Sequence, residues 1–162
     1  MDENNEFKKN CNKAMDSAVR VLARRSHTKY EIRQKLRQRG FSTDVISKVL
    51  SECERLNYVN DEETARIYLR ELRSKGYGPR RISVFFKKKG IGHELTDTLL
   101  HKDNAEDELE TAHKAFSKKL ATFDREKDMR KRREKIYRYL YYRGFSSSVI
   151  SEVIRMDSCE ID

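Results

Sequence analysis

Residues 36–42, with the sequence LRQRGFS, are the first of three related stretches that set the architecture of this chain. The second reads FKKKGIG at 86–92, and the third reads LYYRGFS at 140–146. The glycine that the three stretches share recurs about every 50 residues. A period of this length is typical of a supersecondary unit that stacks on copies of itself. The sequence therefore predicts a tandem-repeat protein.

Composition predicts that each repeat is helical. Apolar residues make up 36% of the 162 residues and charged residues 39%, so the chain is poor in core material and rich in surface. One proline and six glycines are too few for a fold built of many short strands and turns. A lone unit of roughly 50 residues would be marginally stable, which favours repeats that share contacts.

The first repeat shows how three short helices follow one another. Thr28 and Glu31 have the spacing of a capping box, so a helix is expected to begin just after Thr28. Gly40 suits the left-handed conformation that ends a helix, and Ser42 can cap the helix that follows. In the second repeat, Pro79 fits the first position of the corresponding middle helix. We therefore predict an all-α fold of three tandem three-helix repeats.

The expected organisation follows from these signals. A polar segment without periodicity, residues 1–13, is predicted to be a disordered tail. The three repeats are assigned to residues 14–59, 60–103 and 104–157. The third contains a charged insert at 124–134, for which either an extended helix or a solvated loop is possible.

Positive charge is concentrated in the middle helix of every repeat. Residues 29–39 sum to +4, residues 79–89 to +5 and residues 130–143 to +6, against a net charge of +9 for the whole chain. Such a strip predicts a surface that faces a polyanion, although each cluster alone could be a solvated face. The candidate residues for binding a partner or DNA are Lys29, Arg33, Arg37, Arg80, Arg81, Lys87, Lys88, Lys89, Arg130, Arg133, Arg138 and Arg143.

Tyrosines interleave with arginines in the third middle helix. The four are Tyr137, Tyr139, Tyr141 and Tyr142. Nucleic-acid bases could stack on them, but aromatic residues at helical spacing more often belong to a core, and at least one is expected to be buried.

A helix-turn-helix reading competes with the repeat reading, because a short glycine-containing turn joins two helices in each repeat. The helix after the turn would then read bases. The segments concerned, 42–55, 92–103 and 146–157, each carry a small net negative charge. Sequence-specific DNA reading is therefore disfavoured, and Lys48 and His93 in these segments are expected to be dispensable for binding.

Several functional classes find no support in the sequence. Cys11, Cys53 and Cys159 are odd in number and widely spaced, which argues against a disulfide framework or zinc site and predicts a reducing, cytoplasmic location. Motifs for nucleotide binding or nucleophilic catalysis are absent, so we expect neither an enzyme nor a metal or other cofactor. No apolar run approaches the roughly 20 residues that cross a bilayer, and no membrane partner is expected.

The run from Tyr58 to Tyr68 and the sequence KGYGPRRI at residues 75–82 resemble the RecX family of bacterial recombinase regulators. The third glycine stretch resembles the family's last repeat, and the likeness extends over about residues 14–156. The short polar N-terminus and the 124–134 insert depart from the family pattern.

The resemblance implies an elongated, curved array that lies in the groove of the RecA–DNA filament as a monomer. There it would inhibit ATP hydrolysis, strand exchange and the filament's SOS co-protease activity. Weak, non-specific binding to single- or double-stranded DNA is also implied. The alternative is a basic helical protein that binds DNA by itself.

Overall fold

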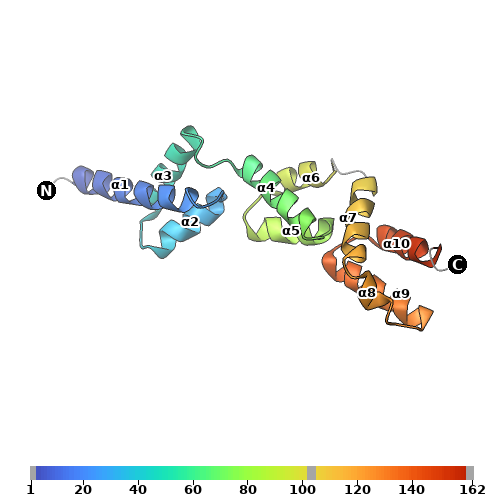
Figure 1. The fold of residues 1–162 in the computed structure, drawn as a ribbon. Helices are drawn as coiled ribbons and strands as arrows, with labels where there is room; N and C mark the ends of the chain where they lie inside the picture. The colour runs from blue at the N-terminus through green and yellow to red at the C-terminus, as the bar shows by residue number, and fades with distance from the viewer. Residues whose placement is uncertain (1–2, 102–104, 160–162) are drawn as a thin grey trace. The chain divides into compact units, whose positions relative to one another are not determined.

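The computed structural model describes residues 3–101 and 105–159, and within these residues the chain is all helical, without strands (Figure 1). The all-α prediction is thereby confirmed. The helices are α1 (Glu3–Leu22), α2 (Lys29–Gln38), α3 (Thr43–Arg55), α4 (Asp61–Ser74), α5 (Pro79–Lys88), α6 (His93–His101), α7 (Ala105–Ser117), α8 (Leu120–Phe123), α9 (Met129–Arg143) and α10 (Ser147–Cys159).

Contacts divide the chain into two compact units. Unit 1 contains residues 1–66 and 88–91, and unit 2 contains residues 67–87 and 92–162. Each unit thus holds one terminal repeat together with part of the second repeat. The repeat boundary predicted after residue 59 stays a prediction, and the one predicted after residue 103 lies outside the described residues.

In unit 1, α1, α2 and α3 pack on one another (Figure 1). The predicted capping box is confirmed, because the Thr28 hydroxyl accepts from the backbone N–H of Glu31 and the Glu31 carboxylate accepts from that of Thr28. Ser42 caps α3 as expected. The core consists of Ala14, Ala18, Ile32, Leu36, Val45, Ile46, Val49, Leu50, Cys53 and Val59.

The prediction of a disordered tail at residues 1–13 is wrong for the part that the structure describes, because α1 begins at Glu3. Residues 1–2 lie outside the described residues. Cys11 is half-buried against the unit 1 core and Ala14 is fully buried, so the first half of α1 extends a helix that is already anchored. Phe7 lies one turn before Cys11 on the same side of the helix. This weak apolar spacing was the signal that the sequence reasoning missed.

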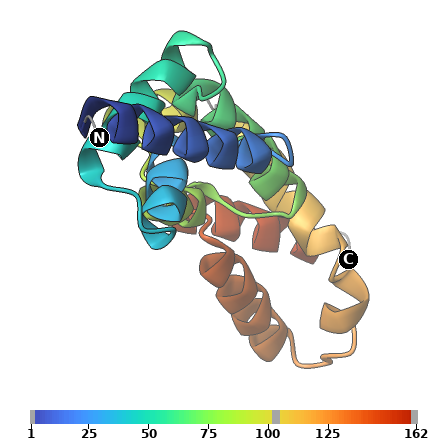
Figure 2. The same ribbon diagram turned by 90° about the vertical axis from the view of Figure 1, so that its left-hand side faces the viewer.

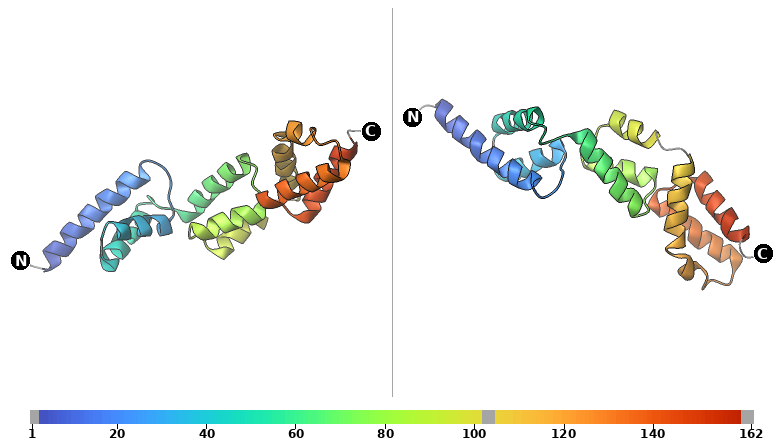
Figure 3. Two further views of the ribbon diagram at one scale, coloured as in Figure 1. Left: turned by 90° about the horizontal axis from the view of Figure 1, so that it is seen from below. Right: turned by 45° about the horizontal axis from the view of Figure 1, so that its top comes forward.

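In unit 2, α7, α9 and α10 pack on one another (Figure 3). Their core is formed by Ala112, Ala115, Phe116, Phe123, Ile136, Leu140, Phe145, Val149, Ile150 and Val153. From α5, Ile82 and Phe86 are also buried, as the apolar spacing predicts. The ring of Phe85 meets Tyr68 of α4 edge-on at a centroid distance of 5.4 Å.

The charged insert forms both a loop and a helix. After the short helix α8, residues 124–128 lead to the start of α9 at Met129 (Figure 2). Asp128 caps α9 by accepting from the backbone N–H groups of Arg130 and Lys131. The next residue of the insert, Arg132, is 5% exposed and makes a two-bond ion pair with Asp157 of α10, at 2.9 and 2.6 Å. The insert is therefore anchored to the third repeat.

The shared glycines end the middle helices with positive φ, as predicted. Gly40, Gly90 and Gly144 have φ values of 81°, 71° and 91°. A side chain in this conformation clashes with the backbone, so glycine is the residue of choice there. The glycine that recurs in the sequence thus marks the same feature, the end of the middle helix, in all three repeats.

Candidate partner-binding surface

The outer face of α5 combines positive charge with an exposed apolar residue. Because Ile82 and Phe86 point into the core, the opposite side of the helix faces outward. Val84 is apolar and 70% exposed on this side. Lys87 and Lys88 are exposed, and the side chain of neither makes an ion pair or hydrogen bond to any residue that the structure describes. We call Val84, Lys87 and Lys88 the α5 face.

Two further candidates on α5 make contacts within unit 2 as well. The Arg80 guanidinium donates to the backbone carbonyl of Phe145 at 2.6 Å, and Arg81 donates to that of Tyr142 at 3.3 Å. Arg81 also lies 5.1 Å from the centroid of the Tyr77 ring. Both arginines therefore help to hold repeats together, and charge reversal at Arg81 would disturb these contacts.

In unit 1, two candidate lysines are ion-paired. Lys89 pairs with Glu31, and Lys29 pairs with Glu54 at 2.8 Å. The hydrogen bond to Glu54 raises the pKa of Lys29, so this lysine stays charged. Arg33 and Arg37 are exposed on α2, and their side chains contact none of the described residues by hydrogen bonds or ion pairs.

The basic segment of α9 is largely occupied by contacts within unit 2. Arg143 donates to the backbone carbonyls of Lys75 and Gly76. Arg130 pairs with Glu134 at 3.4 Å, while Arg133 and Arg138 are exposed.

The segment 130–143 owes part of its apparent positive charge to residues with structural partners. The hydrogen bonds and charges of Asp157 and Asp124 raise the pKa of Arg132, while Lys135 pairs with Glu126.

The tyrosines of α9 divide into one that packs on the core and three that are exposed. Tyr139 is partly buried against the unit 2 core and donates its hydroxyl to the carbonyl of Ala115 at 3.1 Å, so one tyrosine shares the inner face of the helix with Leu140. Tyr137 and Tyr141 stack at a centroid distance of 6.0 Å. Tyr142 is 69% exposed.

An open depression of about 390 Å³ is lined by Thr122, Phe123, Lys135, Arg138, Tyr139 and Tyr142.

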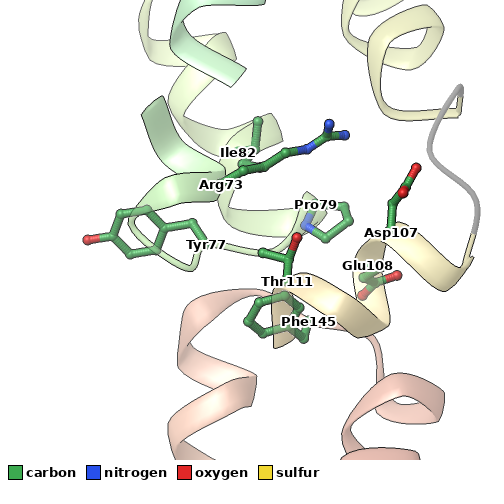
Figure 4. Close-up of a pocket in the computed structure, with 8 residues that line it drawn as sticks. All are labelled: Arg73, Tyr77, Pro79, Ile82, Asp107, Glu108, Thr111 and Phe145. Atoms are coloured by element: carbon green, nitrogen blue, oxygen red, sulfur yellow. The ribbon is translucent and has the colours of Figure 1, made fainter. Parts of the chain in front are cut away.

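A second hollow in unit 2 is too small for an organic ligand (Figure 4). Its cavity volume is about 10 Å³, room for a single water. The eight residues around it are Arg73, Tyr77, Pro79, Ile82, Asp107, Glu108, Thr111 and Phe145. Burial lowers the pKa of Arg73, and the nearby Asp107 opposes that shift.

Val84 is the functional candidate that the charge count overlooked. It lies on the polar side of α5, where helical periodicity predicts a hydrophilic residue. An apolar side chain out of phase with the core was the available signal. Partner surfaces commonly join an apolar contact to surrounding charge, so this residue belongs with Lys87 and Lys88.

The described part of the chain contains neither a membrane-spanning helix nor a cluster of metal ligands. No helix there is both long enough and apolar enough to cross a membrane. Within the same residues, no three side chains of histidine, cysteine, aspartate or glutamate are grouped so that they could hold a metal ion.

Comparison with known proteins agrees with the repeat architecture. Residues 14–53 match the first three-helix domain of RecX, and residues 106–154 match the third. "Regulatory protein RecX" of Legionella pneumophila (strain Corby) is 39% identical over 144 residues, which cover 88% of this chain and 93% of that protein. The protein of the same name from Haemophilus influenzae (strain PittEE) is 29% identical over 150 residues, covering 92% and 97%.

A crystal structure of RecX from Lactobacillus salivarius has the same fold. Its TM-score is 0.81 at 24% identity, and the match covers 92% of this chain and 97% of that one.

The helical composition and the three glycine-terminated middle helices define a class, namely all-helical proteins built of tandem three-helix repeats. Given the identity to the Legionella protein over most of both sequences, the chain belongs to the RecX family. The relatives cited above are named regulatory proteins.

Proposed function

We propose that this protein is a non-catalytic regulator that binds the groove of the RecA–DNA filament in the cytoplasm and inhibits recombinase ATPase, strand exchange and SOS co-protease activity. The α5 face is the proposed contact. Family membership supports the regulatory role, and the exposure of Lys87 and Lys88 supports the choice of surface.

The α5 face lies on the side of its helix that takes no part in the core. The α5 residues Ile82 and Phe86 build the core, whereas Lys87 and Lys88 have no ion-pair partner among the described residues. Two adjacent ammonium groups without a counter-charge raise the local positive potential, which attracts an acidic groove and accelerates encounter. Val84 would then lose its exposed surface on contact, which adds an apolar contribution to the electrostatic one.

Independent binding to single-stranded DNA is the second candidate. The observation in its favour is the depression beside Tyr142 and Arg138, since an exposed aromatic ring next to a guanidinium can stack on a base and contact its phosphate. The two functions differ in what they require. Filament inhibition depends on the recombinase, whereas simple phosphate binding falls steeply with salt for any DNA.

The test is the rate of recombinase ATP hydrolysis on single-stranded DNA, measured with increasing amounts of this protein. We expect inhibition that increases with the amount of this protein and then saturates. A parallel salt titration on the same DNA without recombinase measures direct binding. Unchanged ATPase at concentrations that saturate the DNA would refute the proposed function and leave the DNA-binding candidate.

A further inference from the structure

Contacts between successive repeats recur with one geometry. In unit 1, the Thr28 hydroxyl at the start of α2 donates to the backbone carbonyl of Lys89, the residue before Gly90, at 2.7 Å. In unit 2, the backbone N–H of Gly78 at the start of α5 donates to the carbonyl of Arg143, the residue before Gly144, at 2.8 Å. We call these contacts junction A and junction B. In both, the start of one middle helix docks on the glycine turn that ends the next.

The docked helix lies so close to the turn that only glycine fits. A Cβ atom added at Gly90 would lie 2.3 Å from the Cβ of Tyr30 in junction A. One added at Gly144 would lie 2.5 Å from the backbone nitrogen of Arg81 in junction B. Both distances are far below van der Waals contact, so these two glycines serve the docking as well as the backbone conformation.

The side chain before each glycine reaches into the docked repeat. Lys89 pairs with Glu31, which lies in the first turn of α2. Arg143 donates to the carbonyls of Lys75 and Gly76, which precede α5. Each occupied turn therefore offers a backbone carbonyl to a helix start and a cationic side chain to the docked repeat, and in junction A that cation pairs with a carboxylate in the first turn of the docked helix.

The third turn of this kind, at Gly40, has no helix docked on it among the residues that the structure describes. Gly40 has the same positive φ, yet no described atom lies within 4 Å of the position that its Cβ would take. Arg39 precedes it as Lys89 and Arg143 precede their glycines, and its guanidinium lies against Ser17 of α1. Beside it, Lys13, Arg20 and Arg39 contribute cations to an open depression of about 350 Å³ that Asp16 and Ser17 also line.

We infer that the Gly40 turn docks the N-terminus of a helix from a protein partner, with a carboxylate in that helix's first turn paired to Arg39. This inference rests on the proposed function, in which the partner is the recombinase filament. The chemistry is that of junction A, where Thr28 supplies the hydrogen bond and Glu31 supplies the carboxylate. Positive charge around the turn complements such an acidic helix start.

The middle helices of a second copy of this chain cannot supply the docking helix in the same way. The middle helix whose start is not docked is α9. It begins at Met129, about one turn further from the glycine that ends it than α2 and α5 begin from theirs. Arg132 stands at the position that corresponds to Thr28 and Gly78, and it is buried in its pair with Asp157. The third repeat therefore presents no equivalent helix start.

The test uses Gly40→Asn, because asparagine tolerates positive φ better than other residues with a side chain. No atom of the described residues lies within 4 Å of the new Cβ, but a helix docked as in junction A would meet it. Gly92→Asn is the matched control, since Gly92 also has open space around its Cβ position and starts α6 rather than a junction. Binding is measured to recombinase filaments on single-stranded DNA that are held by a non-hydrolysable ATP analogue.

We expect Gly40→Asn to melt close to the parent temperature and to bind the filament at least about tenfold more weakly, while Gly92→Asn binds as the parent does. Equal binding by the folded Gly40→Asn variant overturns the inference. A loss of binding to DNA without recombinase, or a change in self-association, also overturns it, because the occupant would then be nucleic acid or a second copy.

Carbodiimide coupling of Arg39→Lys to the filament identifies the occupant. A crosslink from residue 39 to a carboxylate in the first turn of a recombinase helix supports the inference, and crosslinks to other positions alone contradict it. Lys87→Glu with Lys88→Glu is assayed alongside. If that variant loses filament binding and Gly40→Asn does not, the inference fails and the proposed function stands. If the parent itself does not bind the filament, both fail.

Discussion

Helices α5 and α9 occupy the same place in successive repeats, yet their outer faces differ. Both end at a glycine with positive φ, and their buried positions correspond, with Ile82 matching Ile136 and Phe86 matching Leu140. Outward, α5 carries Val84, Lys87 and Lys88, whereas α9 carries Tyr137, Tyr141 and Tyr142. The inner residues define the repeat, so differences in function must lie in the outer ones.

The contrast extends to how the basic residues are used. In α9, Arg132 and Arg143 hold the structure through buried or backbone contacts, and Lys135 is ion-paired. In α5, the side chains of Lys87 and Lys88 make no hydrogen bond or ion pair with any described residue. Basic residues at the same place in two repeats therefore differ in use: Lys87 and Lys88 of α5 are available for binding, whereas Arg132, Lys135 and Arg143 of α9 have structural partners.

The largest expected effect is the loss of the α9 anchor. Replacing Arg132 by Ala leaves Asp157 buried without its partner, which should lower the free energy of unfolding by about 3–5 kcal/mol. Urea unfolding followed by circular dichroism measures this loss. Arg130→Ala is the control, because its exposed pair with Glu134 should contribute less than about 1 kcal/mol. Similar losses of unfolding free energy in both variants would show that the buried pair of Arg132 stabilises the fold no more than the exposed pair of Arg130 does.

Gly144 and Gly40 should differ in their tolerance of a methyl group. Gly144→Ala adds backbone strain of about 1–2 kcal/mol and a clash with Arg81, so it should destabilise more than Gly40→Ala, which adds strain alone. Chemical denaturation of the two variants makes the comparison. Equal losses would show that Gly144 is needed only to end α9 and that close docking at junction B has little cost.

The smallest effect concerns pH. His27 precedes the start of α2, and the residue that corresponds to it before α5 is Tyr77. Burial lowers the pKa of His27 below its ordinary value of 6.5, partly offset by the hydrogen bond to the carbonyl of Arg25. The unfolded chain therefore takes up a proton more readily, and stability should fall as the pH drops below about 6.5. Thermal melts at pH 7 and pH 5 should show this loss.

Replacing His27 by Gln should reduce the pH dependence of the melting temperature. If the parent and His27→Gln lose equal stability on acidification, other groups account for the effect.

The sequence predicted the features that are repeated and local. Capping by Thr28, the end of α2 at Gly40 and the buried spacing of Ile82 and Phe86 each depend on neighbours within a few residues. The role of Arg132 could not be predicted, because it lies in a charged run and its partner Asp157 is 25 residues away. The elongated, curved shape of the array and the repeat boundaries stay predictions.

The candidate surface was predicted in part. Charge counting found Lys87 and Lys88, but it ranked them equally with Arg81 and Arg143, whose contacts depend on how repeats meet. Val84 was missed because counting considered only charge. The distinction between available and occupied cations is a property of tertiary contacts, which a single sequence does not reveal.

Reversal of charge on the α5 face is the decisive measurement. The variant Lys87→Glu with Lys88→Glu is compared with Lys8→Glu with Lys9→Glu, which changes net charge equally on exposed residues of α1. Both should keep the helical circular-dichroism signal. We expect only the α5 variant to lose inhibition of recombinase ATPase, by about tenfold or more in the concentration required. Equal inhibition by the two folded variants would contradict the assignment of the α5 face as the filament-binding surface.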